Sequence, residues 1–386
     1  MTTDFTATKR QFHLPEGLIY LDGNSLGPLP KTAAARVAQA ITSEWGELLI
    51  RGWNKAGWMD QPTKVGDRVA RLIGAEAGHV VMGDTLSIKV YQALASALQL
   101  APQRRVILSD TGNFPSDLYM AQGLAQTLGA DYRLKTVAPE AVLEAIDDTV
   151  AVVMITEVDY RSGRRHDMAA LSARAHAVGA MIVWDLAHSA GAFPLQVAKD
   201  GADFAVGCSY KYLNAGPGAV GGVFVHEKWA TNTNTPRLGG WWGNDEATRF
   251  KMEKGFLPKP NASGWNISTT QVFNCIGLKT SLELFDEAGI ENLRKKSISL
   301  TNYLAFLMQQ LPNLSFEIIT PSPPHQRGAQ LSLYFKENAK AIHNKMIENG
   351  IIVDFREPGV IRLAPAPMYC SYLDVHQFYC ILRDNF

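Results

Sequence analysis

The residues best suited to chemistry are an aspartate and a lysine that each follow a short apolar segment. Residues 181–184 are apolar and lead to Asp185, and residues 203–208 lead to Lys211, 26 positions after the aspartate. In an α/β protein, both strand ends open onto the sheet edge where ligands bind. A lysine that forms an imine with pyridoxal phosphate (PLP) needs a carboxylate partner for the ring nitrogen. The pair predicts a PLP site, against the alternative of a surface lysine and a capping aspartate.

The carboxylate of Asp185 has a definite task in such a site. An opposite charge beside the pyridine nitrogen favours its protonated form, and the pyridinium then draws electrons from a carbanion on the substrate. His188 follows Asp185 by three positions. We expect this histidine to lie over or beside the ring, or else to be a structural histidine with satisfied hydrogen bonds.

Two further segments have residue types that suit a planar, phosphorylated cofactor. Phe114 follows a predicted strand and turn, where its ring could stack on the cofactor, and Asp117 could hydrogen-bond to it or cap the next helix. The segment from Gly83 to Ser87 leads into a predicted helix, and free N–H groups at a helix start bind phosphate. Ser87 adds a hydroxyl, although an ordinary N-cap serine explains it nearly as well.

Other patterns are weaker. Residues 216–221 spell G-x-G-x-x-G, but a strand follows, whereas a dinucleotide-binding motif must open a helix, so we interpret the segment as a turn. Arg362 ends an apolar segment, where it could bind a substrate carboxylate or form an internal salt bridge. Trp241 and Thr269 lie in loop-rich sequence that could form an interface or a pocket, or pack locally. The histidine spacing predicts no metal site.

Composition excludes several classes of protein. The 386 residues include 46% hydrophobic and 19% charged residues, as in an ordinary globular enzyme. Lysine plus arginine equals aspartate plus glutamate, at 37 each, so we expect no nucleic-acid partner. We also expect no signal peptide, no membrane span and no disulfide framework, because the four cysteines are scattered. These features predict a cytoplasmic protein.

Helix and strand signals alternate from about residue 65. Short strands without polar alternation, between helices, predict an α/β fold with a mostly parallel central sheet covered by helices on both faces. After residue 273 a long helix leads to an α+β pattern, which predicts a small C-terminal domain. We therefore expect an N-terminal segment at 1–50 that packs on the small domain, a large domain at 51–288 and a small domain at 289–386.

Seven motifs, in order along nearly the whole chain, resemble one family. They are LDGNSLGPLP at 21–30, FPSD at 114–117, DLAHSAGA at 185–192, SYKYLNAGPG at 209–218, GWWGN at 240–244, RFKM at 249–252 and IRLAPAPMY at 361–369. Together they resemble the kynureninases, PLP enzymes of fold type I in the aspartate aminotransferase superfamily. The resemblance implies a homodimer with shared active sites that cleaves L-kynurenine hydrolytically to anthranilate and L-alanine in tryptophan catabolism.

The resemblance also implies roles for individual residues. Lys211 would carry the cofactor and act with Tyr210 and Asp185 in catalysis. The other residues implied in cofactor binding are Leu86, Ser87, Phe114, Asp117, Ser162, His188, Trp241 and Thr269, of which Trp241 and Thr269 would come from the partner subunit. Arg362 would bind the substrate α-carboxylate, and Trp58 and Thr269 would contact its aromatic part.

The chain departs from the family pattern at three positions. Asn244 stands where a histidine is frequent, and Trp58 and Thr269 stand where animal members have histidine and asparagine. These differences resemble bacterial enzymes that prefer kynurenine over 3-hydroxykynurenine. Four alternatives remain open: a cysteine desulfurase, although Cys370 follows Arg362 in the wrong order; an aminotransferase; a binding module without turnover; and a variant with altered substrate range.

Overall fold

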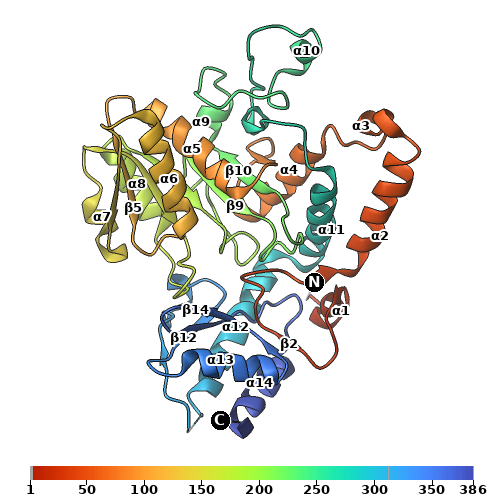
Figure 1. Cartoon of the computed structure of the whole chain (residues 1–386), viewed down its shortest axis with the longest axis vertical. Coiled ribbons are helices and arrows are strands. Elements are labelled where there is room, and N and C mark those ends of the chain that lie inside the picture. The colour runs from red at the N-terminus through yellow and green to blue at the C-terminus, as the bar shows by residue number, and fades with distance from the viewer. Residues whose placement is uncertain (1–2, 312, 386) are drawn as a thin grey trace.

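The protein is described here by a computed structural model that covers residues 3–311 and 313–385. Two sheets organise it (Figure 1), a seven-stranded sheet in the first two thirds of the chain and a four-stranded sheet near the C-terminus. Helices α11 (Val272–Ala288) and α12 (Ile290–Met308) follow one another with Gly289 between them and lead from the first region to the second.

The large sheet has the order β4-β10-β9-β8-β7-β5-β6. Its strands are β4 (Val80–Met82), β5 (Val106–Asp110), β6 (Arg133–Val137), β7 (Val150–Thr156), β8 (Met181–Asp185), β9 (Phe204–Cys208) and β10 (Gly221–Val225). Strands β9, β8, β7, β5 and β6 are mutually parallel, and β10 is antiparallel to both β9 and β4. The mostly parallel sheet predicted from the sequence is confirmed.

Both faces of this sheet are buried, because neighbouring residues of one strand pack into different cores. In β8, Val183 belongs to one hydrophobic cluster, whereas Ile182 and Trp184 belong to the other. Helices α5 (Leu86–Leu100) and α6 (Pro115–Leu128) pack with the first cluster, and α4 (Gln61–Ile73) with the second. Burial on both faces explains why the strands are apolar without alternation.

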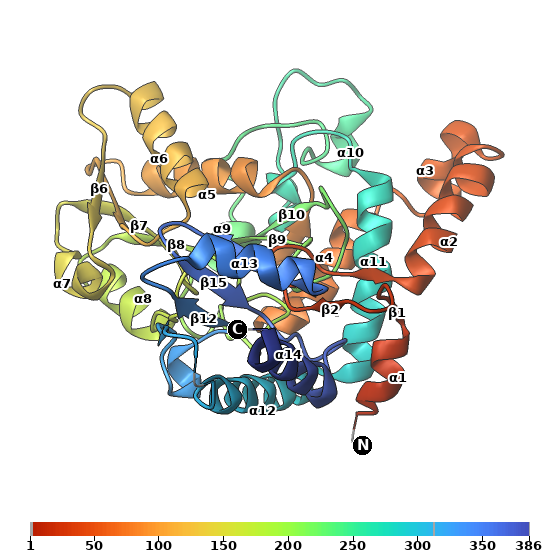
Figure 2. The same cartoon turned by 60° about the horizontal axis from the view of Figure 1, so that its bottom comes forward.

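The C-terminal region is α+β. Its antiparallel sheet has the order β11-β12-β15-β14, with strands β11 (Glu317–Ile318), β12 (Leu331–Tyr334), β14 (Asp354–Arg356) and β15 (Val360–Leu363). The same region contains helices α12, α13 (Ala339–Glu348) and α14 (Tyr372–Asn385). Figure 2 shows α14 beside α12.

The N-terminal segment contributes to this region. Strand β2 (Ile19–Tyr20) pairs in parallel with β13 (Ile351–Ile352), and β1 (Phe12–His13) pairs with β3 (Leu29–Pro30). Helix α1 (Phe5–Arg10) is tied to α14 by the ion pair from Lys9 to Asp374, at 2.6 Å.

Several local features were not predicted from the sequence. Helix α2 (Lys31–Gln39) is followed by a π-helical turn at Ala40–Trp45. Strands β4 and β6 were not predicted, because β4 is short and β6 is only partly buried, so neither has a long apolar run.

The remaining elements are short. They are the 3₁₀ helices Leu49–Arg51, Pro139–Ala141, Ala262–Trp265 and Pro324–Gln326, and helices α3 (Gly52–Lys55), α7 (Val142–Ala145), α8 (Met168–Ala177), α9 (Glu227–Ala230) and α10 (Glu246–Arg249). Within residues 3–311 and 313–385, no helix has both the length and the apolar character needed to cross a bilayer.

Candidate active site

The candidate site lies where four parallel strands of the large sheet end. Strand β8 ends at Asp185, β7 ends at Thr156, and Lys211 follows the end of β9 by three residues. Phe114 follows β5 and stands directly before helix α6. Because parallel strands open onto one edge, these four segments meet there, at the position where ligands bind in open α/β sheets.

Lys211 has a largely closed environment, with only 9% of its surface exposed. Its Nζ lies 3.1 Å from Nε2 of His188. The same atom lies 5.6 Å from the centroid of the Phe114 ring and 5.9 Å from that of Tyr210. The fold therefore brings three of the predicted site residues, His188, Phe114 and Tyr210, around the Lys211 amine.

Asp185 is oriented by groups behind it. Its Oδ1 accepts a hydrogen bond of 2.8 Å from the backbone N–H of Ala187, and its Oδ2 lies 3.4 Å from Oγ1 of Thr156. The Thr156 hydroxyl also donates to Oδ1 of Asn113. Sequence reasoning missed Thr156 and Asn113, because each is a single polar residue at a strand end or turn and belongs to no motif.

Two buried carboxyl groups share this environment. Burial, together with the negative charge of Asp185, raises the pKa of Asp117 well above its usual range. Burial also raises the pKa of Asp185, although the positive charge of Lys211 opposes the shift. Oδ2 of Asp117 has no hydrogen-bond partner among the described residues. Two acids thus lie near one lysine, and a further cation would favour the ionised form of Asp185, whose pKa is the less strongly raised of the two.

His188 is held neutral in this environment. Burial lowers its pKa well below the usual value, and the positive charges of Lys211, Arg362 and Arg356 lower it further. Its Nδ1 is buried and has no partner in the part of the chain that the structure describes. A buried polar atom without a partner costs about 1–3 kcal/mol, so a ligand that supplied one would stabilise the site.

The predicted phosphate-binding segment begins helix α5. Its backbone N–H groups at Leu86 and Ser87 open the helix, and Oγ of Ser87 lies 3.2 Å from Oγ of Ser116 in the first turn of α6. A Cβ atom on Gly221 would lie 2.7 Å from the Leu86 nitrogen, so only glycine leaves this approach open. Two helix starts with adjacent hydroxyls suit an anion. Ser116 was not singled out from the sequence.

Arg362 has internal partners for its guanidinium group. Its Nε donates to Oδ2 of Asp354 at 2.6 Å, which is the internal salt bridge that the sequence left open. Its Nη1 and Nη2 donate to the carbonyl of Tyr160 and to Oγ of Ser25. The Tyr160 ring packs edge-on against Phe114 at 5.2 Å, which links the guanidinium to the lysine environment.

The other predicted residues lie outside this cluster. Ser162 donates to Oδ1 of Asp159 in the turn after β7. Trp58 is buried, and its Nε1 donates to Oε2 of Glu44. Trp241 and Thr269 lie exposed on loops. No described contact joins any of these four side chains to Lys211, so their roles remain predictions.

A close approach near Lys211 was also missed. The N–H of Gly27 donates to the carbonyl of Tyr210 at 2.8 Å, and a Cβ on Gly27 would lie 2.7 Å from the Lys211 carbonyl oxygen. Only glycine allows this contact, which holds the N-terminal segment against the lysine turn. The segment LDGNSLGPLP at 21–30 is rich in turn-forming residues, but its sequence does not show what Gly27 contacts.

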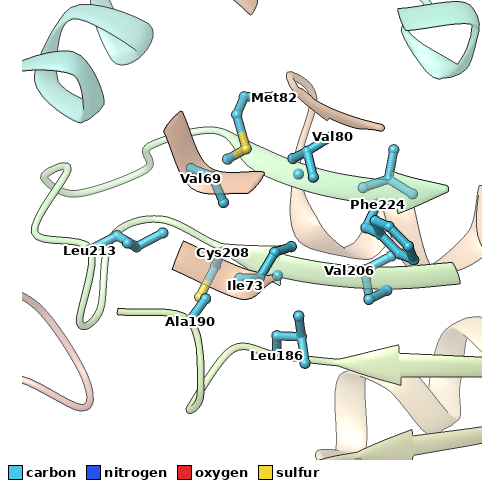
Figure 3. A pocket seen from close by; sticks show the side chains of 14 residues that line it. Val69, Ile73, Val80, Met82, Leu186, Ala190, Val206, Cys208, Leu213 and Phe224 are labelled. Carbon is cyan, nitrogen blue, oxygen red and sulfur yellow. The ribbon is translucent and has the colours of Figure 1, made fainter. Parts of the chain in front are cut away.

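A small apolar cavity is not part of the site. Its volume is about 20 Å³. Figure 3 shows the side chains that line it, among them Val69, Met82, Leu213 and Phe224. Its lining contains no charged side chain and not Lys211, so it is a packing void in the core between α4 and the sheet.

Comparison with known proteins identifies the family. The model of the kynureninase C-terminal domain matches residues 293–382. Kynureninase of Deinococcus radiodurans is 44% identical over 379 residues, which cover 96% of this chain and 91% of that protein. The chain belongs to the kynureninase family. Kynureninase of Pseudomonas fluorescens is 41% identical over 382 residues, covering 97% of this chain and 91% of that protein.

Solved structures confirm the fold. A cysteine desulfurase from Thermococcus onnurineus has a TM-score of 0.81 at 18% identity, covering all of this chain and 98% of that one. C-DES with glycine covalently linked to its PLP cofactor also has a TM-score of 0.81 at 18% identity, covering 97% and 99% of the two chains. At this identity the likeness shows the fold, which is the predicted fold type I.

The site of this kynureninase-family chain fits PLP, the cofactor predicted from the sequence. The two acids, Asp117 and Asp185, lack the second cation that a pyridinium nitrogen supplies. The starts of α5 and α6 offer donors for a phosphate, and Lys211 offers the amine. The PLP prediction is confirmed by the family and the fold, whereas the assignment of individual residues remains a prediction.

Proposed function

We propose that the protein hydrolyses the Cβ–Cγ bond of L-kynurenine to give anthranilate and L-alanine. The observation that carries this proposal is the convergence of Lys211, Asp185 and His188 at one sheet edge in a chain of the kynureninase family. PLP bound there would supply the electron sink for negative charge that develops on the substrate.

The residues of the chain then have separate tasks. Lys211, once its amine is free, removes the α-proton of the substrate as a general base. Asp185 would keep the pyridine nitrogen of bound PLP protonated. The N–H of Ala187 holds the Asp185 carboxyl group in place, and the Thr156 hydroxyl, itself hydrogen-bonded to Asn113, lies beside it. Water adds to the γ-carbonyl before the carbon–carbon bond breaks. Tyr210 is our candidate for carrying protons in the later steps, since it directly precedes Lys211 and its ring lies 5.9 Å from the lysine Nζ.

Arg362 would bind the α-carboxylate of the substrate. Its fork is buried, and two of its nitrogens contact only neutral oxygens, those of Tyr160 and Ser25. A carboxylate is a stronger acceptor for a guanidinium than a neutral oxygen. Asp354 would then hold the arginine through Nε while the other two nitrogens face the substrate.

We further propose that two copies share their active sites in the cytoplasm. Trp241 is 41% exposed, and the Thr269 side chain is exposed as well, which suits residues that complete the site of a partner. Trp58 and Thr269 would contact the aromatic ring of the substrate, with kynurenine preferred over its 3-hydroxy form. Ser162 would line the same site.

Cysteine desulfurase activity is disfavoured by the position of Cys370. A desulfurase needs a nucleophilic thiolate on an accessible loop. Here the thiol is buried, its Sγ donates to the carbonyl of Tyr20, and burial raises its pKa to about 12. A thiol so protonated and enclosed is a poor nucleophile.

The proposal is tested by incubating the PLP-loaded protein with L-kynurenine and following anthranilate fluorescence, with alanine measured in parallel. We expect equal amounts of anthranilate and alanine and slower turnover of 3-hydroxykynurenine. An aminotransferase would instead require a keto-acid acceptor and convert the cofactor to its amine form. Absence of anthranilate and hydroxyanthranilate from the loaded protein would refute the proposed reaction.

A further inference from the structure

A second lysine, Lys89, is completely buried in the first turns of helix α5. Its Nζ donates three hydrogen bonds, to Oδ2 of Asp84 at 3.0 Å, to the carbonyl of Trp265 at 2.9 Å and to Oδ1 of Asn266 at 3.0 Å. An ammonium group has three N–H donors, so every donor of Lys89 has an acceptor.

The acceptors belong to two separate segments. Asp84 lies in the turn that precedes α5 and adopts a left-handed backbone with φ of 56°. This conformation is unfavourable for a non-glycine residue and persists where its surroundings fix it. Trp265 and Asn266 lie about 180 positions further along the chain, at the end of a 3₁₀ helix. Lys89 therefore joins the turn before α5 to the loop that leads to α11.

Two further hydrogen bonds hold the same turn, one to the residue before α11 and one to the sheet. The N–H of Asp84 donates to Oε1 of Gln271 at 3.2 Å, and the carbonyl of Asp84 accepts from the N–H of Gly221 at 3.0 Å. Gly221 is the residue whose missing side chain leaves room beside the Leu86 nitrogen. The position of the turn thus controls where the first N–H groups of α5 lie.

Burying this charge is costly. Transfer of an ammonium group out of water costs several kcal/mol, and a buried ion pair is often no more stable than apolar residues of similar size. Burial accordingly lowers the pKa of Lys89, while Asp84 opposes the shift. An apolar side chain at position 89 would satisfy packing, but it could not hold Asp84 and Asn266 together.

We propose that Lys89 is a positioning residue that fixes the Asp84 turn against the 265–266 backbone and so presets the N–H groups of Leu86 and Ser87 to bind the phosphate of the cofactor. The inference deepens the proposed function and rests on the PLP site assigned above. Lys89 itself is buried beneath the turn and acts only through it.

The test compares PLP with pyridoxal, which has the same aldehyde and ring but no phosphate. Lys89→Met keeps the length of the side chain and removes its charge. Ser96→Ala is the matched control, because Ser96 lies on the same helix, is equally buried and accepts from Nε1 of Trp265, but makes no described contact with the turn. Both affinities are measured by titration of the cofactor-free proteins, and their melting temperatures are recorded.

We expect Lys89→Met to bind PLP about tenfold or more weakly, since the phosphate contacts are charge-assisted, and to bind pyridoxal within about twofold of the unaltered protein. Ser96→Ala should keep the ratio of the two affinities. General destabilisation would weaken both ligands alike in Lys89→Met, and that result, or no change in either affinity, would overturn the proposal.

A second variant covers the case in which Lys89→Met does not fold. Asp84→Asn alters the other side of the same contact, where the Asp84 side chain is 15% exposed. It should lower the ratio of the affinity for PLP to the affinity for pyridoxal, as Lys89→Met does. An unchanged ratio in Asp84→Asn would also overturn the inference. The test is independent of turnover, so a protein that binds PLP but leaves kynurenine intact would refute the proposed function alone.

Discussion

Two buried lysines, Lys89 and Lys211, differ in how completely their amines are hydrogen-bonded. Lys89 donates to three oxygens, one of them a carboxylate at 3.0 Å. Lys211 lies near aromatic rings and a neutral histidine, and forms no ion pair within 4.0 Å in the ranges that the structure covers. The three hydrogen bonds of Lys89 suit a structural role, whereas the amine of Lys211 has fewer partners and remains available to react.

The surroundings of the two lysines differ in the same way. Near Lys211, Oδ2 of Asp117 and Nδ1 of His188 are buried without described partners. Around Lys89, Oδ1 of Asn266 accepts from the lysine, and its Nδ2 donates to the carbonyl of Met82. Oε1 of Gln92, whose Nε2 donates to the same Trp265 carbonyl as Lys89, is also buried without a described partner, so the contrast concerns the atoms beside each amine. Unsatisfied polar atoms are tolerated where a ligand will satisfy them, and those beside Lys211 point to it as the cofactor lysine.

The largest effect is expected from Lys211→Ala. Removal of the amine eliminates both cofactor attachment and the general base, so kcat/KM for kynurenine should fall by about 10³-fold or more. Anthranilate fluorescence measures the loss, and the visible absorbance of the purified protein should disappear. Lys228→Ala, at a half-exposed lysine, is the control. Hydrolysis that persists in Lys211→Ala would show that another residue is the base.

The second largest effect is expected from Asp185→Asn, and it distinguishes the role of Asp185 from that of Asp117. Asp185→Asn removes the charge that favours a protonated ring nitrogen, and kcat should fall about 10²-fold or more. Asp117→Asn should cost at least tenfold less, because the raised pKa of Asp117 already favours a neutral side chain. Both are measured as kcat at saturating PLP and kynurenine. Equal losses in the two variants would contradict these separate roles.

A smaller effect is expected at the phosphate. Ser87→Ala removes one hydroxyl beside Ser116, and the Kd for PLP should rise about tenfold, as for one hydrogen bond to a charged group. The Kd for pyridoxal should not change. Calorimetric titration of the cofactor-free protein provides both values. If Ser87 were only a helix cap, its loss would lower the melting temperature and weaken both ligands equally.

The smallest effect concerns stability of the cofactor-free protein. The folded-state pKa of Asp117 lies above its ordinary value of 3.8, so the native state binds more protons than the unfolded state once the pH exceeds that value. Stability is therefore lost as the pH rises from 3.8 through the raised pKa. Asp117→Asn removes this loss, and its gain in melting temperature should be larger at about pH 8 than at about pH 5. A gain independent of pH would contradict the raised pKa.

The reactive pair was predictable from sequence because its signals are local. Apolar segments marked the strands, and Asp185 and Lys211 follow two of them directly. Parallel strands then require their ends to meet. The motif residues Phe114 and His188 were found for the same reason, since each follows a strand or strand end closely.

The supporting residues were not predictable in this way. Lys89 is a single charged residue near the start of an apolar helix, and a lysine is ordinarily exposed. Its acceptors at Trp265 and Asn266 are distant in sequence. The role of Asn113 follows only from the pairing of β5 with β7, which brings its amide to the carbonyl of Met154 in β7. The end of helix α2 at Gln39 was also not predictable, because the π-helical segment that follows, Ala40–Trp45, contains no proline or glycine.

The central claim is that Lys211 holds the cofactor and that Lys89 does not. It is tested most directly by reducing the PLP-loaded protein with borohydride, digesting it and locating the pyridoxyl group by mass spectrometry. The account predicts the label on the peptide that contains Lys211 and none on the peptide that contains Lys89. A label on Lys89 or on any lysine other than Lys211, or a holoprotein that acquires no label, would contradict it.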